Sequence, residues 1–256
     1  MKKLIISLSI ISIVAFSSCG PTSRVGDASV KVAQAFLMTD AQIEGYTKEF
    51  IDQSDKENTV AAANDAYSVR LSRIAGNINN KDGINIKVYK TKDINAFACA
   101  DGSVRVFSGL MDIMSDEEVL GVIGHEIGHV KNRHTKEAFR NALMVSAARD
   151  VIASAGGTVA VLTDSQLGDI GAAFLSARFS QRQEYEADDY GYEFLKSHGL
   201  NPWAMSLSFQ KLKSMEESSG TPKTGAIMQL FSTHPDLNSR IKRMSDRATS
   251  EGFKKP

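Results

Sequence analysis

The sequence predicts an α+β fold that is mainly helical, with a small antiparallel sheet beside one apolar helix. Three observations lead to this prediction. INIKVYK and SVRVFSGL alternate apolar and polar residues, as strands with one buried face do. Most of the remaining chain has the apolar spacing of amphipathic helices. Between these parts stands VLGVIGHEIGHVKNRH, an apolar run interrupted by two histidines and a glutamate.

The first residues are typical of a secretion signal. Two lysines precede an uncharged apolar block from Leu4 to Phe16, which is too short to span a bilayer. SSCG follows and resembles a bacterial lipobox, so we expect residues 1–19 to be a lipoprotein signal peptide. Cys19 would then be the lipidated first residue of the mature protein, with a plainly cleaved signal as the alternative. Gly20, in place of aspartate, favours the outer membrane over the inner one.

Composition narrows the class of protein further. The chain of 256 residues has 30 basic and 30 acidic residues, so no charge excess indicates nucleic-acid binding. If Cys19 carries lipid, Cys99 has no disulfide partner, and we expect it to be a buried free thiol. Residues 20–27 are expected to form a tether, and residues 28–256 are long enough for a single domain with one core.

Helices and a small sheet are expected to precede the motif. Residues 28–78 read as mainly helical, with a break near Ser54-Asp55-Lys56. A turn at NKDG leads into a strand in which Ile84, Ile86 and Val88 alternate. DINAFACA and SVRVFSGL, joined by Asp101-Gly102, then predict a hairpin. The central helix follows, because Ser115 can cap it and Glu118 completes a capping box.

The second half of the chain is expected to be helical. The apolar segment from Leu143 to Phe174 predicts a helical hairpin or flap, broken at Gly156-Gly157. Membrane insertion is the weaker alternative, because the longest uncharged run in it is too short. SQRQEYEADDYGYEFLKSHG predicts a helix that ends at His198-Gly199, and Asn201-Pro202 begins the next one. A polar loop is expected over Lys213–Thr224, followed by a helical C-terminus.

The two histidines of HExxH predict a metal site. Residues four apart share one face of a helix, so His125 and His129 can bind one ion. Glu126 points about 100° round the helix and can act as a general base without competing for the metal. Zinc is expected, because a catalytic zinc commonly takes three protein ligands and a water.

The third ligand has to come from another segment. Thr135 occupies the position where a metzincin has its third histidine, and we expect His134 to be a helix-end polar residue. The segment QEYEADDYGYE offers carboxylates instead. Glu184 and Asp188 share one face, extended by Gly191, which allows close helix approach. A second face is more easily solvated and carries the other acids of the segment, namely Glu186, Asp189 and Glu193. Spacing favours the first face but does not settle the choice.

Three motifs in the order HEIGHVKNRH, FSQRQEYEADDYG and THPDLNSR resemble the HtpX and CAAX-prenyl-protease family of zinc metallopeptidases. The chain is especially similar to the branch of single-domain bacterial lipoproteins. The resemblance implies a gluzincin-type zincin fold with Glu184 as the third zinc ligand. It also implies that Asp188 supports a zinc-bound histidine, which fixes the tautomer of the imidazole.

The same resemblance assigns further residues. His234, from the HP motif, would lie beside the zinc, where it caps the metal at rest or steadies the oxyanion. A loop histidine packed beside Pro235 is the plainer alternative. Arg240 and Arg182 are expected to buttress the site. In related metallopeptidases an edge strand pairs with extended substrate, which would fall on Asn95, Ala96, Phe97 and Ala98. A core hairpin explains these four residues equally well.

The resemblance implies a metalloendopeptidase with one Zn²⁺ per chain, acting on unfolded or misassembled envelope proteins from the periplasmic side. The apolar segment from Leu143 to Phe174 could then cover the cleft as a lid. A non-proteolytic, chaperone-like lipoprotein working with envelope assembly machinery is a second hypothesis, and a purely structural lipoprotein is a third. The intact set His125, Glu126, His129 and Glu184 argues against both. Prenyl-protein processing is not expected, because that activity belongs to multispanning relatives.

Overall fold

The structure is a computed structural model that describes residues 38–78, 81–148, 162–218, 230 and 232–256. Cys19, the expected signal peptide, the tether and the Gly156-Gly157 break lie outside the described residues. No helix in the described part of the chain is long and apolar enough to cross a membrane.

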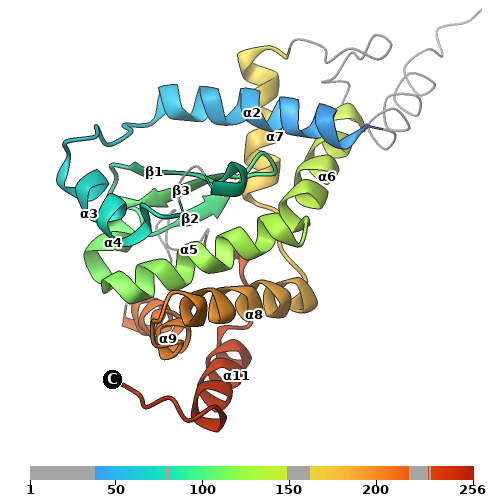
Figure 1. Ribbon diagram of the computed structural model, residues 1–256. Helices are drawn as coiled ribbons and strands as arrows, with labels where there is room; N and C mark the ends of the chain where they lie inside the picture. Colours follow the sequence, from blue (N-terminus) through green and yellow to red (C-terminus); the bar gives the residue numbers. More distant parts are fainter. Residues whose placement is uncertain (1–37, 79–80, 149–161, 219–229, 231) are drawn as a thin grey trace, which may run out of the picture.

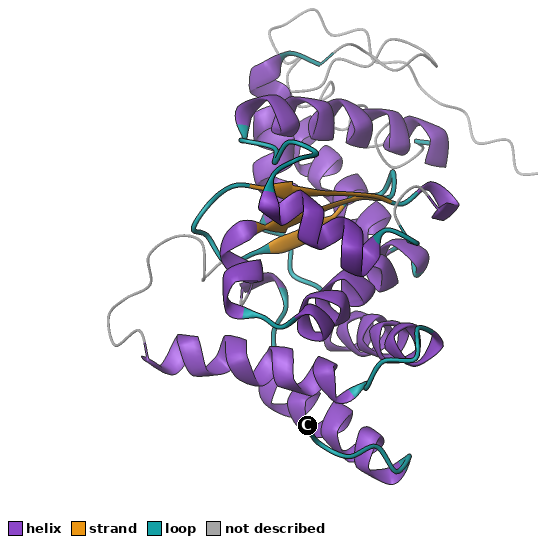
Figure 2. Ribbon diagram, turned by 60° about the vertical axis from the view of Figure 1, so that its left-hand side comes forward, coloured by secondary structure: helices purple, strands orange, loops and turns teal. Residues whose placement is uncertain are grey.

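Helices cover both faces of a small sheet (Figures 1 and 2). Helix α2 lies over one face, and the motif helix α5 lies against the other, with α8 beyond α5. One apolar core fills the space between the sheet, α5, α8 and α9, and a second lies between α2, α6, α7 and the sheet. The helices are α2 (Asp40–Glu57), α3 (Ala66–Ala75), the 3₁₀ turn η1 (Lys81–Gly83), α4 (Ser108–Ile113), α5 (Asp116–Lys131), α6 (His134–Ala148), α7 (Asp164–Leu175), α8 (Gln181–Ser197), α9 (Trp203–Ser218) and α11 (Leu237–Ser250).

The sheet is mixed rather than antiparallel. Its described strands are β1 (Asn85–Tyr89), β2 (Ala96–Ala98) and β3 (Ser103–Phe107), in the order β1-β3-β2. The predicted hairpin of β2 and β3 is antiparallel, but β1 runs parallel to β3. The chain leaving β1 crosses over the end of β3 at Gly109, where a Cβ would lie 2.4 Å from two backbone oxygens. This crossing places β2 at the edge of the sheet.

Helix α5 begins as predicted and runs through the interior. Ser115 and Glu118 form the capping box, and His125, Glu126 and His129 are all buried. Helices α5 and α8 approach closely because three glycines line their contact: a Cβ on Gly124, Gly128 or Gly191 would lie 2.8–2.9 Å from a neighbouring heavy atom. Gly191 therefore has the role in helix packing that its sequence position suggested.

Some predicted boundaries are wrong. The break after α2 falls at Asn58, not at residues 54–56, because Asp55 bonds to the sheet instead of ending the helix. Its carboxylate accepts hydrogen bonds from Arg105, Lys87 and Tyr89 at 2.7 Å each. Helix α9 continues through Ser218, into the expected loop over 213–224. Cys99 is a buried free thiol, as predicted, and burial raises its pKa well above the usual range.

The Asp55 contacts predict a pH dependence of stability. Burial opposes ionisation, but the Arg105, Lys87 and Tyr89 hydrogen bonds prevail and lower the pKa of Asp55 to about 2. A lowered pKa stabilises the fold above the ordinary value of 3.8, and this contribution disappears as the pH falls towards 2. Urea unfolding of metal-free protein should show that Asp55→Asn costs about 2 kcal/mol at pH 7 and almost nothing at pH 2.

Asp52→Asn is the matched control for this experiment. Asp52 lies on the same helix and pairs with Lys48 at the surface, so the change should cost less than about 1 kcal/mol at either pH. An equal cost for the two substitutions at pH 7 would contradict the stabilising role of Asp55.

Candidate metal centre

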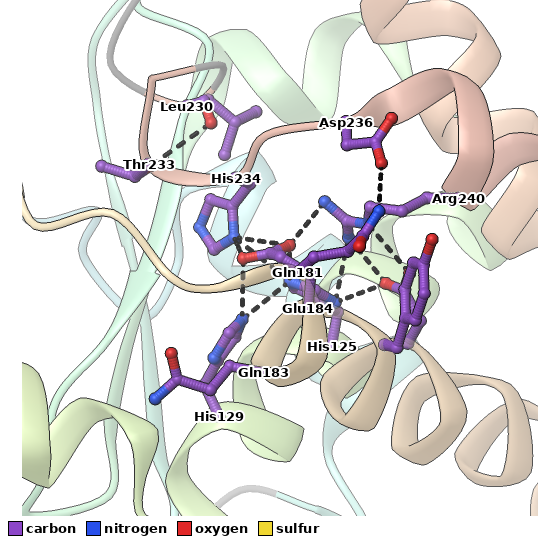
Figure 3. Close-up of polar contacts among 12 residues, drawn as sticks. His125, His129, Gln181, Gln183, Glu184, Leu230, Thr233, His234, Asp236 and Arg240 are labelled. Carbon is purple, nitrogen blue, oxygen red and sulfur yellow. Dashed lines mark hydrogen bonds and ion pairs between the residues drawn. The ribbon is translucent and has the colours of Figure 1, made fainter.

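Four buried side chains from separate segments converge at one point beside α5 (Figure 3). Helix α5 provides His125 and His129, helix α8 provides Glu184, and the segment before α11 provides His234. One nitrogen or oxygen of each residue lies within 4.8 Å of the others. The HP histidine is therefore not simply a loop residue packed beside Pro235, because its ring joins the cluster.

The spacing of these atoms fits a metal ion. His125 Nε2 lies 3.1 Å from His129 Nε2 and 3.3 Å from His234 Nδ1. Glu184 carboxylate oxygens lie 3.6–3.7 Å from the Nε2 atoms of His125 and His129. Zinc–nitrogen bonds of about 2.05 Å at a tetrahedral angle place two ligand atoms about 3.3 Å apart. Several lone pairs this close repel one another unless a cation or protons lie between them, so the residues present fit a bound metal.

Asp188 and Arg240 lie directly behind the cluster. Asp188 Oδ1 is 2.9 Å from His125 Nδ1, so it accepts that N–H and leaves Nε2 facing the cluster. Arg240 donates to Asp188 through Nε at 2.8 Å and Nη2 at 2.6 Å. Its Nη1 forms an ion pair with Glu184 Oε2 at 2.6 Å, without hydrogen-bond geometry.

The Arg240 guanidinium keeps both acids ionised. Burial favours the neutral carboxyl groups, but the charges around them prevail. Arg240 lowers the pKa of Asp188, and His234 together with Arg240 lowers the pKa of Glu184. The guanidinium also lies over the Phe209 ring, 4.3 Å from its centroid. The site is therefore built around one buried cation and two buried carboxylates, of which Glu184 faces the metal position.

Glu126 lies next to the four convergent side chains. It is 2% exposed, and its Oε1 is 3.7 Å from His234 Nε2. Burial raises the pKa of Glu126 above its ordinary value of 4.5. A carboxylate with a raised pKa accepts protons more readily near neutral pH, as a general base must.

His134 is a functional candidate that sequence reasoning missed. It is the first residue of α6 and only 4% exposed, and its Nδ1 lies 3.0 Å from His129 Nδ1. The expectation of a helix-end residue was correct, but the turn before it is unusual. Arg133 has a φ of 65°, so the chain turns back and brings His134 onto His129. A third histidine five positions after HExxH is the only sequence signal of this contact.

A comparison with known protein families identifies the family of this chain. The model of peptidase family M48 matches residues 66–248, which is more than half of the chain. The chain belongs to peptidase family M48. It is 38% identical to the metalloprotease LoiP of Escherichia coli over 99% of both chains. It is 35% identical to the metalloprotease YcaL of the same species, over 90% of this chain and 89% of YcaL. It is also 29% identical to a protease HtpX homolog of Thermococcus sibiricus, over 66% of this chain.

Family membership confirms the predicted enzyme class: this M48 protein is a metalloendopeptidase with a mainly helical α+β fold. The residues of the second acidic face are partly solvated, as expected, but they are also paired. Asp189 contacts Arg243 and Arg247, and Glu193 contacts Arg247, which ties α8 to α11.

The structure corrects the expected role of Arg182. We expected it to buttress the site, but its side chain is 86% exposed and pairs with Glu186 instead of with one of the four clustered residues. Its position at the start of α8 turns it to solvent, whereas Glu184, two residues on, faces α5.

Cavities open on both sides of Glu126 and His234. One is lined by the edge strand, at Asn95–Ala98, and by Phe174, Leu175, Ala177 and Phe179 at the end of α7 and beyond it. The other has an apolar wall made by Val122, Phe209, Leu212, Leu230 and Leu237, and His125 and Arg240 also line it. Together they give this M48 centre a cleft with a strand edge on one side and an apolar pocket on the other.

Proposed function

We propose that the protein is a zinc-dependent endopeptidase that cleaves unfolded or misassembled proteins of the cell envelope. One zinc ion per chain would be held by His125, His129 and Glu184. The convergence of these ligand atoms within one buried cluster, beside the buried carboxylate of Glu126, carries the proposal. M48 membership supports it independently.

In this proposal each residue around the ion has a separate task. Bound zinc would supply a Lewis acid that acidifies water and polarises a peptide carbonyl. Glu126 would accept the proton from that water and carry it to the leaving amine. His234 Nε2, on the same side as Glu126, would donate a hydrogen bond to the carbonyl oxygen as its negative charge develops. The other ring nitrogen of His234, Nδ1, faces the cluster, where it lies 3.0 Å from Glu184 Oε1 and 3.3 Å from His125 Nε2.

Metal analysis tests this function directly. Purified chain supplied with zinc should contain one zinc per molecule and cleave casein. A chelator should remove both the metal and the cleavage, and added zinc should restore them. The proposal fails if folded protein remains metal-free in excess zinc. If the chain binds zinc but shows no chelator-sensitive cleavage, it is a metal-binding protein and not a peptidase.

The edge strand is proposed to bind substrate as an added strand. Asn95 and Cys99 make backbone hydrogen bonds to β3. Because strand residues alternate, the backbone groups of Ala96 and Ala98 point to the open edge. The Ala96 N–H bonds to the Asn95 side chain, so the Ala96 carbonyl and both Ala98 groups are the candidates for pairing. The cavity beside them leads to Glu126 and His234.

Substrate backbone methylation tests this pairing without changing the enzyme. N-methylation at a residue whose N–H pairs with β2 should lower kcat/KM about tenfold or more, since it removes one hydrogen bond and adds a clash. Methylation at the next residue, whose N–H points away, is the matched control and should have little effect. Equal effects at both positions would contradict strand addition.

The shape of the cleft suggests the kind of substrate. The pocket beside Glu126 would take an apolar side chain next to the scissile bond, because Val122, Phe209, Leu212, Leu230 and Leu237 form the apolar part of its wall. Phe174 and Leu175 at the end of α7 line the cavity on the opposite side. A narrow cleft with a strand edge accepts extended chain more readily than folded protein.

The cellular setting belongs to the same proposal. The lipobox-like SSCG supports a lipid anchor on Cys19, on the periplasmic side of the envelope and more readily in the outer membrane than in the inner one. Envelope proteins and their assembly machinery would then be the partners. Incorporation of labelled palmitate into the wild type but not into Cys19→Ser would support the anchor, and equal labelling would refute it.

A further inference from the structure

We propose that His134 and Glu186 are positioning residues that fix the tautomer of His129, so that its Nε2 lone pair faces the metal position. This inference rests on the proposed function only in taking His129 as a metal ligand. It assigns a role to a buried histidine and a surface carboxylate on two helices outside the HExxH segment.

A continuous chain of polar contacts runs from the cluster to the surface. His129 Nδ1 lies 3.0 Å from His134 Nδ1, and His134 Nε2 lies 3.0 Å from Glu186 Oε2. Arg182 donates to the other oxygen of Glu186 at 2.7 Å. These contacts join α5, α6 and α8. The exposed fraction of the side chains rises along the chain of contacts, from 0% for His129 to 86% for Arg182.

Proton counting along this chain selects one tautomer. Glu186 is partly exposed and forms an ion pair with Arg182 at 2.7 Å, so its carboxylate is ionised and can only accept hydrogen bonds. His134 Nε2 must therefore carry the hydrogen in that contact. A neutral imidazole then has a lone pair on Nδ1, so the proton between the two rings belongs to His129. With its hydrogen on Nδ1, a neutral His129 has its lone pair on Nε2.

His125, the other histidine expected to bind the metal, also has its tautomer fixed by a carboxylate. His125 Nδ1 donates directly to Asp188, whereas His129 Nδ1 reaches a carboxylate through His134. Both histidines thus present Nε2 to the cluster, where those two atoms are 3.1 Å apart. The intervening histidine lets the second carboxylate stay partly in solvent. A further buried acid beside Glu126, Glu184 and Asp188 would add to the desolvation cost of the site.

The rings around His129 support a positioning role. Phe179 stacks on the His129 ring with centroids 3.9 Å apart and an interplanar angle of 29°. This contact restricts the ring plane but leaves its tautomer open. The His134 contact is made by Nδ1 alone, whereas the Phe179 ring stacks on the whole imidazole, so the two neighbours have different effects. The left-handed backbone at Arg133, a conformation that is unfavourable in residues other than glycine, places His134 beside His129 Nδ1.

Zinc affinity and NMR on the full mature chain test this inference. His134→Leu removes the acceptor and should weaken zinc binding about 10- to 100-fold, measured by competition with a chelator. His134→Asn keeps an oxygen near the Nδ1 position and should recover most of the affinity. Glu186→Ala should weaken binding less than His134→Leu does. Glu193→Ala is the matched control, since it removes a carboxylate of the same helix that pairs with Arg247 instead.

The NMR measurement needs no bound metal. Nitrogen-15 shifts of metal-free wild type should show the His129 hydrogen on Nδ1, and the two tautomers should mix in His134→Leu. Wild-type affinity in His134→Leu, or a His129 hydrogen on Nε2, would overturn the inference. If His134→Leu does not fold, the Asn and Glu186 variants decide the same question. A chain that binds no zinc at all would refute the proposed function, while the NMR result would still test the tautomer.

Discussion

Glu126→Gln should abolish proteolysis while leaving zinc in place. Glu126 is buried beside the cluster, but it is not among the four residues whose ligand atoms converge. Glutamine has the same shape and cannot accept a proton as a base, so kcat should fall about 10³- to 10⁴-fold. Casein cleavage and bound zinc should be measured on the same preparation, because the prediction is that cleavage is lost while zinc stays bound.

Glu117→Gln on the same helix is the matched control for this loss. Glu117 lies in the first turn of α5, far from the cluster, and its substitution should leave both activity and zinc unchanged. Cleavage by Glu126→Gln at the wild-type rate would show that another group is the base. Loss of zinc in that variant would instead make Glu126 part of the binding site.

His234→Ala provides a comparison that separates the two roles considered for this histidine. Three ligand residues would remain, so zinc should stay bound. If Nε2 donates to the carbonyl oxygen, kcat should fall about 10²- to 10³-fold. We expect this result, since Nε2 faces Glu126 while Glu184 holds Nδ1. Faster cleavage in His234→Ala would show instead that His234 caps the metal at rest.

The parts of the site that could be predicted from the sequence are those set by local spacing. Residues four apart on a capped helix must share a face, and the structure places His125 and His129 side by side. The same spacing on α8 puts Glu184 and Asp188 on the face that meets α5. Glycines at positions 124, 128 and 191 then let the two helices approach closely enough for the side chains to meet.

The parts that could not be predicted depend on where the chain turns between elements. The parallel pairing of β1 and β3 follows from a crossover at Gly109, and nothing in the alternation of the strands specifies it. His134 reaches His129 only because Arg133 adopts a left-handed conformation. Helical spacing alone placed His134 on another face, and one unusual φ angle reverses that expectation. The motif resemblance placed Arg182 at the site, whereas its side chain is 86% exposed.

Arg240→Met should cause the largest loss of stability among the site residues. Arg240 is 1% exposed and contacts both Glu184 and Asp188, each of which is fully buried. Removing one member of a buried ionic group leaves the other charges uncompensated, which typically costs 3–5 kcal/mol. Metal-free Arg240→Met should therefore unfold at a much lower urea concentration than the wild type. Arg240→Lys should be intermediate, because one ammonium group cannot reach both carboxylates as the guanidinium does.

Zinc should recover part of this loss, because a cation beside Glu184 replaces some of the missing positive charge. Arg243→Met is the matched control: Arg243 lies on the same helix but pairs with Asp189 at the surface, so it should cost less than about 1 kcal/mol. Equal losses for the two variants would mean that Arg240 contributes no more than a surface ion pair. If zinc leaves a large loss of stability unchanged, the ion does not bind beside Glu184. The ionic group of Arg240, Glu184 and Asp188 would then be independent of the metal centre.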